Sequence, residues 1–99
     1  MVKHIILWQI KDEYAALADD IRANAKRELE GLAGKIPGMR DITLRIAPLA
    51  TSNCDLMLEV TLEDEESLLG YGSNPQHVAV AQTYLIPYMK LRVCFDYEA

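Results

Sequence analysis

The sequence predicts a single α+β domain, residues 1–99, in which helices pack on one face of a four-stranded antiparallel sheet. Two observations support this prediction. The length of 99 residues suits one domain, because domains typically have about 100–200 residues. Four segments alternate in hydrophobicity as strands do, and segments with helical spacing separate them in the order β-α-β-β-α-β. At this length the order is typical of the ferredoxin-like fold, with the strands expected in the spatial order 4-1-3-2.

Residues 2–11 are predicted to form the first strand. One face carries alternating residues that suit a core, namely His4, Ile6, Trp8 and Ile10. The other face is also apolar, with Ile5 and Leu7. A strand that is apolar on both sides is covered on both sides. We therefore expect helices on one face and a second copy of the chain on the other, so that two sheets pack into a dimeric α/β barrel.

The segment from Glu13 to about Gly34 is predicted to be a helix with Asp12 as its N-cap. Its apolar residues recur every three or four positions and therefore share one helical face. They are Leu17, Ile21, Ala25, Leu29 and Leu32. Pro37-Gly38 then marks a turn.

Two strands are predicted next, at residues 39–47 and Cys54–Leu62, and a short polar loop joins them as a hairpin. Their core-facing residues are Ile42, Leu44 and Ile46 in one strand and Leu56, Leu58, Val60 and Leu62 in the other. The last strand is predicted at Leu91–Tyr97. In the expected strand order, the first strand separates Cys54 from Cys94, so we expect no disulfide.

A short helix is predicted from Glu65 to about Gly70 with Asp64 as its cap, and Gly70–Ser73 is expected to interrupt it as an irregular segment. Asn74 is predicted to cap a second helix, with Pro75 at its first position. That helix is expected to continue to Ile86 and to end before Pro87. Its predicted buried residues include Val78, Ala81 and Leu85.

Charge and composition exclude several classes of function. The net charge is −5 and no Lys/Arg cluster occurs, so nucleic acid and anionic membranes are not expected as partners. The longest apolar run, Ile5–Trp8, is far shorter than the about 20 residues of a membrane span. No signal-peptide pattern opens the chain, and we expect a cytoplasmic protein. Two distant cysteines and two distant histidines do not make a zinc motif, so neither a metal nor a cofactor is expected.

Four stretches of the chain resemble the stress-responsive dimeric α/β barrel (Dabb) family. They are Val2–Leu7, Ile36–Met39, Tyr71–His77 and Val93–Tyr97. The Tyr71–His77 stretch, Tyr-Gly-Ser-Asn-Pro-Gln-His, is the most specific of them. The resemblance implies the ferredoxin-like fold and a homodimer.

One plant member of this family is a polyketide cyclase that works without a cofactor and uses a Tyr and a His in this stretch. Tyr71 and His77 match those two positions, and His4 matches a histidine of its first strand. The cyclase also has a histidine in its third strand where this chain has Leu56, which implies a less polar pocket here.

The chemistry of these side chains gives a candidate site. His77 suits a general base at neutral pH, and the Tyr71 hydroxyl suits an oxyanion donor. His4, Trp8 and Tyr84 are candidates for binding a substrate. In the alternative interpretation, Tyr71 and His77 are structural and hydrogen-bonded, and His4 is a core residue.

We therefore expect a homodimer that binds a small, largely apolar molecule between sheet and helices. A cofactor-independent cyclase or isomerase is one alternative, and a structural stress-response protein without a ligand is another. A third is a cofactor-independent monooxygenase of the related dimeric-barrel family of antibiotic biosynthesis.

Overall fold

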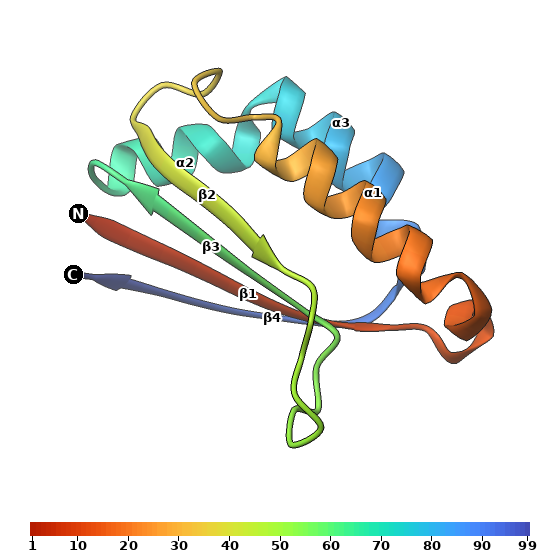
Figure 1. The fold of residues 1–99 in the computed structure, drawn as a ribbon. Helices are drawn as coiled ribbons and strands as arrows, with labels where there is room; N and C mark the ends of the chain where they lie inside the picture. The colour runs from red at the N-terminus through yellow and green to blue at the C-terminus, as the bar shows by residue number, and fades with distance from the viewer.

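The computed structural model describes residues 1–99 and contains the predicted sheet. Strands β1 (Val2–Ile10), β2 (Met39–Arg45), β3 (Leu56–Leu62) and β4 (Met89–Glu98) form one sheet in the order β2-β3-β1-β4. Every neighbouring pair is antiparallel. The expected order 4-1-3-2 is therefore confirmed, and β4 is the edge strand next to β1 (Figure 1).

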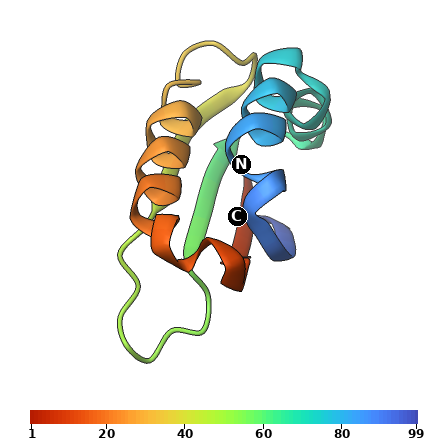
Figure 2. The ribbon, with the colours of Figure 1, turned by 90° about the vertical axis from the view of Figure 1, so that its right-hand side faces the viewer.

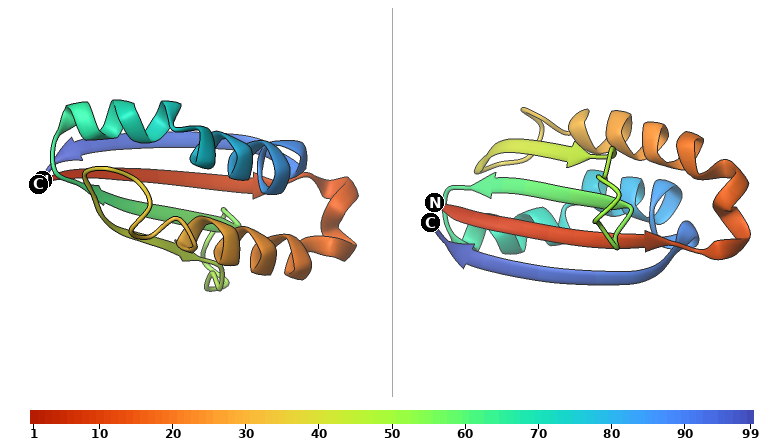
Figure 3. Two further views of the ribbon diagram at one scale, coloured as in Figure 1. Left: turned by 90° about the horizontal axis from the view of Figure 1, so that it is seen from above. Right: turned by 60° about the horizontal axis from the view of Figure 1, so that its bottom comes forward.

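Three α-helices cover one face of this sheet, which we call the inner face. They are α1 (Ala18–Glu30), α2 (Glu65–Ser73) and α3 (Pro75–Tyr84). Helices α1 and α3 lie side by side over the sheet (Figure 2). No helix covers the opposite, outer face (Figure 3). No helix is long and apolar enough to span a membrane.

The core fills the space between the inner face and the helices, because the alternating side chains of the strands point into it. Burial along β1 alternates strictly between buried and half-buried residues, as its pattern predicts. His4, Ile6, Trp8 and Ile10 are buried on the inner face. From α1, Ile21, Ala25 and Leu29 complete the core.

The start of the first helical segment differs from the prediction. Residues Asp12–Leu17 form a 3₁₀ helix, η1, and the N-cap residue is Lys11, without a side-chain cap. The Asp12 carboxylate accepts a hydrogen bond from Lys90 Nζ at 2.9 Å and none from a backbone amide at the start of the helix. Leu17 is consequently 50% exposed rather than part of the core. The α-helix ends at Glu30 and not near Gly34, whose positive φ of 78° lies in the turn that follows.

The segment Gly70–Ser73 also differs, since it continues α2 instead of interrupting it. The reason is burial: Tyr71 lies in the core, and its packing holds the helix through the two glycines. The caps predicted for α2 and α3 are confirmed. The Asp64 carboxylate accepts from the Ser67 amide at 2.8 Å, and the Asn74 side chain accepts from the Gln76 amide at 2.9 Å.

The end of α3 and several strand limits were predicted two or more residues away from where they lie. Helix α3 ends at Tyr84, and Ile86–Tyr88 form the 3₁₀ helix η2 around Pro87. Strand β3 begins two residues later than expected, whereas β4 is longer at both ends than Leu91–Tyr97. Cys54 and Cys94 are both free, which agrees with the expected absence of a disulfide.

Candidate functional site

A cavity of about 260 Å³ lies between the inner face of the sheet and α3. It is lined by 13 residues, of which 8 are hydrophobic. The apolar walls come mainly from Ile6, Trp8, Leu29, Leu58, Val78, Ala81 and Leu85. Val78 and Ala81 are half-buried rather than buried because they face this open space.

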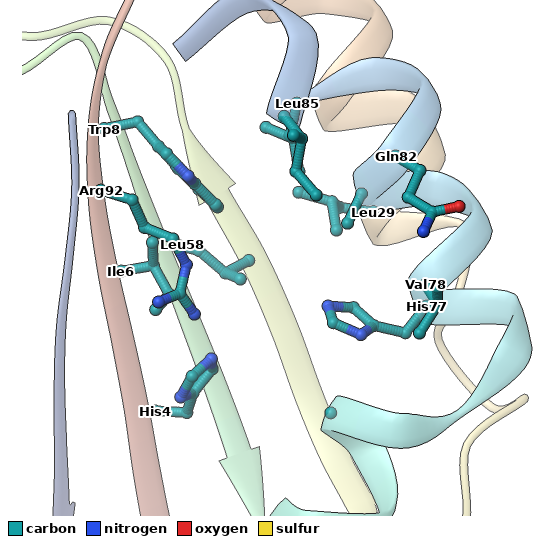
Figure 4. Close-up of a pocket in the computed structure, with 13 residues that line it drawn as sticks. His4, Ile6, Trp8, Leu29, Leu58, His77, Val78, Gln82, Leu85 and Arg92 are labelled. Carbon is teal, nitrogen blue, oxygen red and sulfur yellow. The ribbon is translucent and has the colours of Figure 1, made fainter. Parts of the chain in front are cut away.

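Three basic side chains from three different elements converge on the cavity. His4 comes from β1, Arg92 from the edge strand β4, and His77 from α3. Figure 4 shows the His77 ring pointing from the helix toward the sheet, with His4 and Arg92 projecting from the strands opposite it. Arg92 lies beside Trp8 in the register of the two strands. No acidic residue lines the cavity.

Tyr71 packs behind the two histidines and does not itself line the cavity. Its ring centroid lies 4.2 Å from that of His77 and 5.6 Å from that of His4. Only 1% of Tyr71 is exposed. The Tyr71 hydroxyl and the His77 Nδ1 atom are both buried and have no hydrogen-bond partner. Buried polar groups usually have a partner, so these two atoms mark an unusual place in the fold.

The surroundings of this pair favour the neutral form of both side chains. Burial is the largest cause and lowers the pKa of His77; the charges of His4 and Arg92 act in the same direction, while the Gly72 backbone opposes them. Burial also raises the pKa of Tyr71 well above its usual range, with the charge of Arg92 opposing it. A neutral imidazole can accept a proton, and a protonated phenol can donate a hydrogen bond.

A cluster of His4, Cys94 and Asp96 lies where β1 meets β4. His4 Nδ1 and Asp96 Oδ1 are 2.5 Å apart, and Cys94 Sγ lies 3.8 Å from the same nitrogen and 3.4 Å from the same oxygen. Burial and the Asp96 carboxylate raise the pKa of Cys94, which disfavours a reactive thiolate.

These three side chains are the one group with metal-ligand chemistry, their donor atoms lying within 4.8 Å of one another. Two ligands of a tetrahedral zinc ion lie about 3.3 Å apart, so the His4–Asp96 hydrogen bond would have to open before both atoms bound one ion. The expectation that no metal is bound stays a prediction.

The structure brings together most of the candidate residues. His4, Trp8 and His77 line the cavity, and Tyr71 contacts both histidine rings from behind. Tyr71 lies inside helix α2 and not, as expected, in an irregular segment. Tyr84 lies outside the cavity, in a separate depression beside α1, because it points from α3 toward that helix.

The sequence prediction missed Arg92, which lines the cavity. The alternation of the last strand could have indicated the face on which Arg92 lies. Leu91 and Val93 lie on the outer face, which places Arg92 on the inner face with Cys94 and Asp96. The signal is weak because an isolated arginine in an edge strand is usually solvated.

Comparisons with known proteins agree with the fold. The family model of the stress-responsive A/B barrel domain matches residues 2–99. The chain is similar to a dimeric protein of ferredoxin-like fold from Bacteroides fragilis, with a TM-score of 0.91 and 25% identity over 99% of this chain and 95% of that one. A dimeric ferredoxin-like protein from Thermobifida fusca gives a TM-score of 0.81 and 22% identity over 99% and 90%.

An antibiotic biosynthesis monooxygenase also shares the fold, with a TM-score of 0.76 and 13% identity over 100% of this chain and 98% of that one. No protein with a curated description matches the sequence significantly.

Proposed function

The chain belongs to the stress-responsive A/B barrel domain family (Dabb), and from this premise we propose that it forms a homodimer whose subunits each bind a small, largely apolar molecule between sheet and helices. The observation that carries this proposal is the cavity beneath α3 with its apolar walls and its few convergent polar groups. Such a composition is typical of small-molecule sites. The two free cysteines suit a reducing compartment such as the cytoplasm.

The size of the cavity limits the ligand. An apolar cavity of about 150 Å³ accommodates benzene, whereas pockets for drug-sized molecules begin at about 300 Å³. The volume of about 260 Å³ therefore suits one ring with a short substituent, or a short aliphatic chain.

The outer face of the sheet supports the homodimer. Apolar side chains from β1 and β4 gather there, opposite the face that the helices cover. They are Ile5, Leu7, Leu91, Val93, Phe95 and Tyr97. Large apolar patches of this kind mark interaction sites. The neighbours from Bacteroides fragilis and Thermobifida fusca are described as dimeric, which supports a dimer of this chain.

The ligand-binding proposal is tested by filling the cavity. Trp8 is the only tryptophan and lines the cavity, so its fluorescence reports occupancy directly. We expect propylbenzene, a neutral probe of suitable size, to change this fluorescence in a saturable way. Ala81→Phe places a ring in the cavity and should abolish the change.

Ala79→Phe is the matched control, because Ala79 lies exposed on the same helix and does not line the cavity. It should respond as the unmodified protein does. A fluorescence change that persists in Ala81→Phe would place the probe elsewhere and contradict the proposal.

Cofactor-independent proton transfer is a second candidate, favoured by His77 at the cavity, whose Nδ1 atom is buried without a partner and whose pKa is lowered by burial. His77 would act as the base and Tyr71 as the oxyanion donor. His77→Asn should then abolish turnover while leaving the binding of the neutral probe unchanged. Equal loss of turnover and stability would instead favour a structural role.

A structural protein without a ligand is a third candidate. It predicts a closed cavity and full hydrogen bonding of Tyr71 and His77. The open cavity and the two unpartnered atoms support ligand binding over this alternative. The likeness to an antibiotic biosynthesis monooxygenase, at 13% identity, concerns the fold and adds no support for oxygen chemistry.

A further inference from the structure

We propose that the ligand of this cavity is an apolar molecule with one carboxylate, and that the Arg92 guanidinium binds this carboxylate at the β4 side of the cavity. The inference rests on the proposed function, because it names the chemical class of the molecule that the cavity takes.

The distribution of charge is the first argument. The chain has 15 acidic against 10 basic residues, yet none of the acidic residues lines the cavity. Arg92 is the one lining residue with a permanent charge. An acidic protein thus presents a positive charge to this apolar cavity, which favours an anion there and disfavours a cation.

The second argument is that Arg92 has no partner in the chain. Other arginines that lie near carboxylates form ion pairs, such as Arg22 with Asp55 at 3.1 Å and Arg40 with Glu63 at 2.8 Å. Arg92 forms neither an ion pair nor a hydrogen bond. Asp96, the nearest acid on the same face of β4, is instead hydrogen-bonded to His4. Arg92 is exposed in the single chain, and no protein group binds its five N–H donors, so they can bind a ligand.

The position of Arg92 is the third argument. Figure 4 shows its guanidinium beside Ile6, between Trp8 and His4, and facing the open space below α3. Trp8 and Leu85 form the apolar end of that space, whereas His4 and His77 form its polar end. The charge of Arg92 therefore lies between the apolar end and the two histidines, which matches an apolar tail joined to an anionic head.

The number of donors favours a carboxylate over a phosphate. The planar fork of one guanidinium matches the two oxygens of a carboxylate. The neutral His77 ring adds a hydrogen bond rather than a second positive charge. The single permanent charge of Arg92 balances a carboxylate with one negative charge better than a phosphate with nearly two.

The test compares two probes of the same shape, 4-propylbenzoate and 4-propylbenzamide, by titration against Trp8 fluorescence of the full chain. The proposal predicts tighter binding of the benzoate, by about 10- to 100-fold, which corresponds to charge-assisted hydrogen bonds. Arg92→Met should remove this preference, because it should weaken the binding of the benzoate far more than that of the benzamide. Arg92→Lys keeps the positive charge but lacks the planar guanidinium, so it should retain part of the preference for the benzoate.

Arg27→Met is the matched control, because it makes the same change of net charge on the exposed side of α1. It should bind both probes as the unmodified protein does. A benzoate preference that survives in Arg92→Met overturns the assignment of Arg92. Equal binding of both probes overturns the carboxylate inference while the proposed apolar site stands, and binding of neither probe, nor of propylbenzene, overturns both.

Discussion

At the scale of single residues, His77 differs from a solvated histidine in one feature. The residue lies in the first turn of α3, and its Nδ1 atom is buried there without a hydrogen-bond partner. Burial lowers the pKa of the folded ring from its ordinary value of 6.5. Below that pH the unfolded chain takes up a proton that the folded chain resists, so folding is favoured less.

We therefore expect the free energy of unfolding to fall as the pH drops from 7.5 to 5. The stability that depends on a neutral His77 is fully present above about pH 6.5, the pKa of the unfolded chain. It is lost as the pH falls through the pKa of His77 in the folded protein, which is lower. His77→Asn removes this contribution, so its unfolding should depend less on pH. Urea denaturation at fixed protein concentration measures the difference. An identical pH dependence in both proteins would contradict a lowered pKa of His77.

The hydroxyl of Tyr71 leads to a separate prediction. It is buried without a partner, which costs about 1–3 kcal/mol when no ligand compensates. Tyr71→Phe should accordingly leave the empty protein equally stable or more stable, whereas Tyr71→Ala should cost about 3–5 kcal/mol because it opens a void. Denaturant unfolding measures both. Loss of stability in Tyr71→Phe would show that the hydroxyl is satisfied in solution.

The sequence predicted the residues of the site better than their arrangement. His4, Trp8 and His77 reach one cavity because strand alternation and the Asn74 cap fix their directions. Tyr84 could not be placed in the same way. Helix α3 has half-buried residues on more than one side, and helical spacing alone does not show which side faces the cavity. The unpartnered atoms of Tyr71 and His77 depend on packing and have no sequence signal.

At the scale of elements, α2 shows how burial overrides local preference. Its Gly70 and Gly72 both favour an interruption, yet the helix runs on to Ser73. Gly70 is exposed, and an added Cβ atom would meet nothing within 4 Å. Gly70→Ala should therefore raise the free energy of unfolding by about 0.5–1 kcal/mol, because alanine loses less backbone entropy. Urea denaturation at constant protein concentration measures this.

Gly38 is the matched contrast among the glycines. Its φ is 78°, and an added Cβ atom would collide with the Ser67 side chain. Gly38→Ala should destabilise the protein, since alanine meets both backbone strain and this collision at the start of α2. A destabilised Gly70→Ala together with a tolerated Gly38→Ala would reverse the expected order and contradict the roles assigned to the two glycines.

The elements themselves were largely predictable, and their ends were not. Alternation identified all four strands: β1, β2 and β3 each have buried residues on one face, and β4 alternates in residue type although nearly all its residues are exposed in the single chain. The 3₁₀ helix at Asp12–Leu17 was missed: the Asp12 carboxylate, predicted to cap a helix, binds Lys90, which lies far along the chain. Such competition between a local and a distant partner does not appear in a pattern of residue types.

At the scale of the whole molecule, strand order builds the site from both ends of the chain. Pairing of β1 with β4 sets Arg92 beside Trp8 and Asp96 beside His4. The same pairing gathers the apolar residues of the outer face into one patch. The proposed ligand site and the proposed dimer surface therefore lie on opposite faces of the same two strands, and the order 4-1-3-2 brings the two ends of the chain together there.

The outer face gives the last prediction. Phe95 is 69% exposed there and pairs with Ile5 of β1. In a twofold interface each substitution enters twice, so Phe95→Glu would bury two carboxylates against apolar side chains. Light scattering at micromolar concentration should show a dimer for the unmodified chain and a monomer for Phe95→Glu. Leu69→Glu alters an equally exposed leucine on α2 and should remain dimeric. A monomeric unmodified chain would refute the homodimer, and a dimeric Phe95→Glu would move the interface away from the sheet.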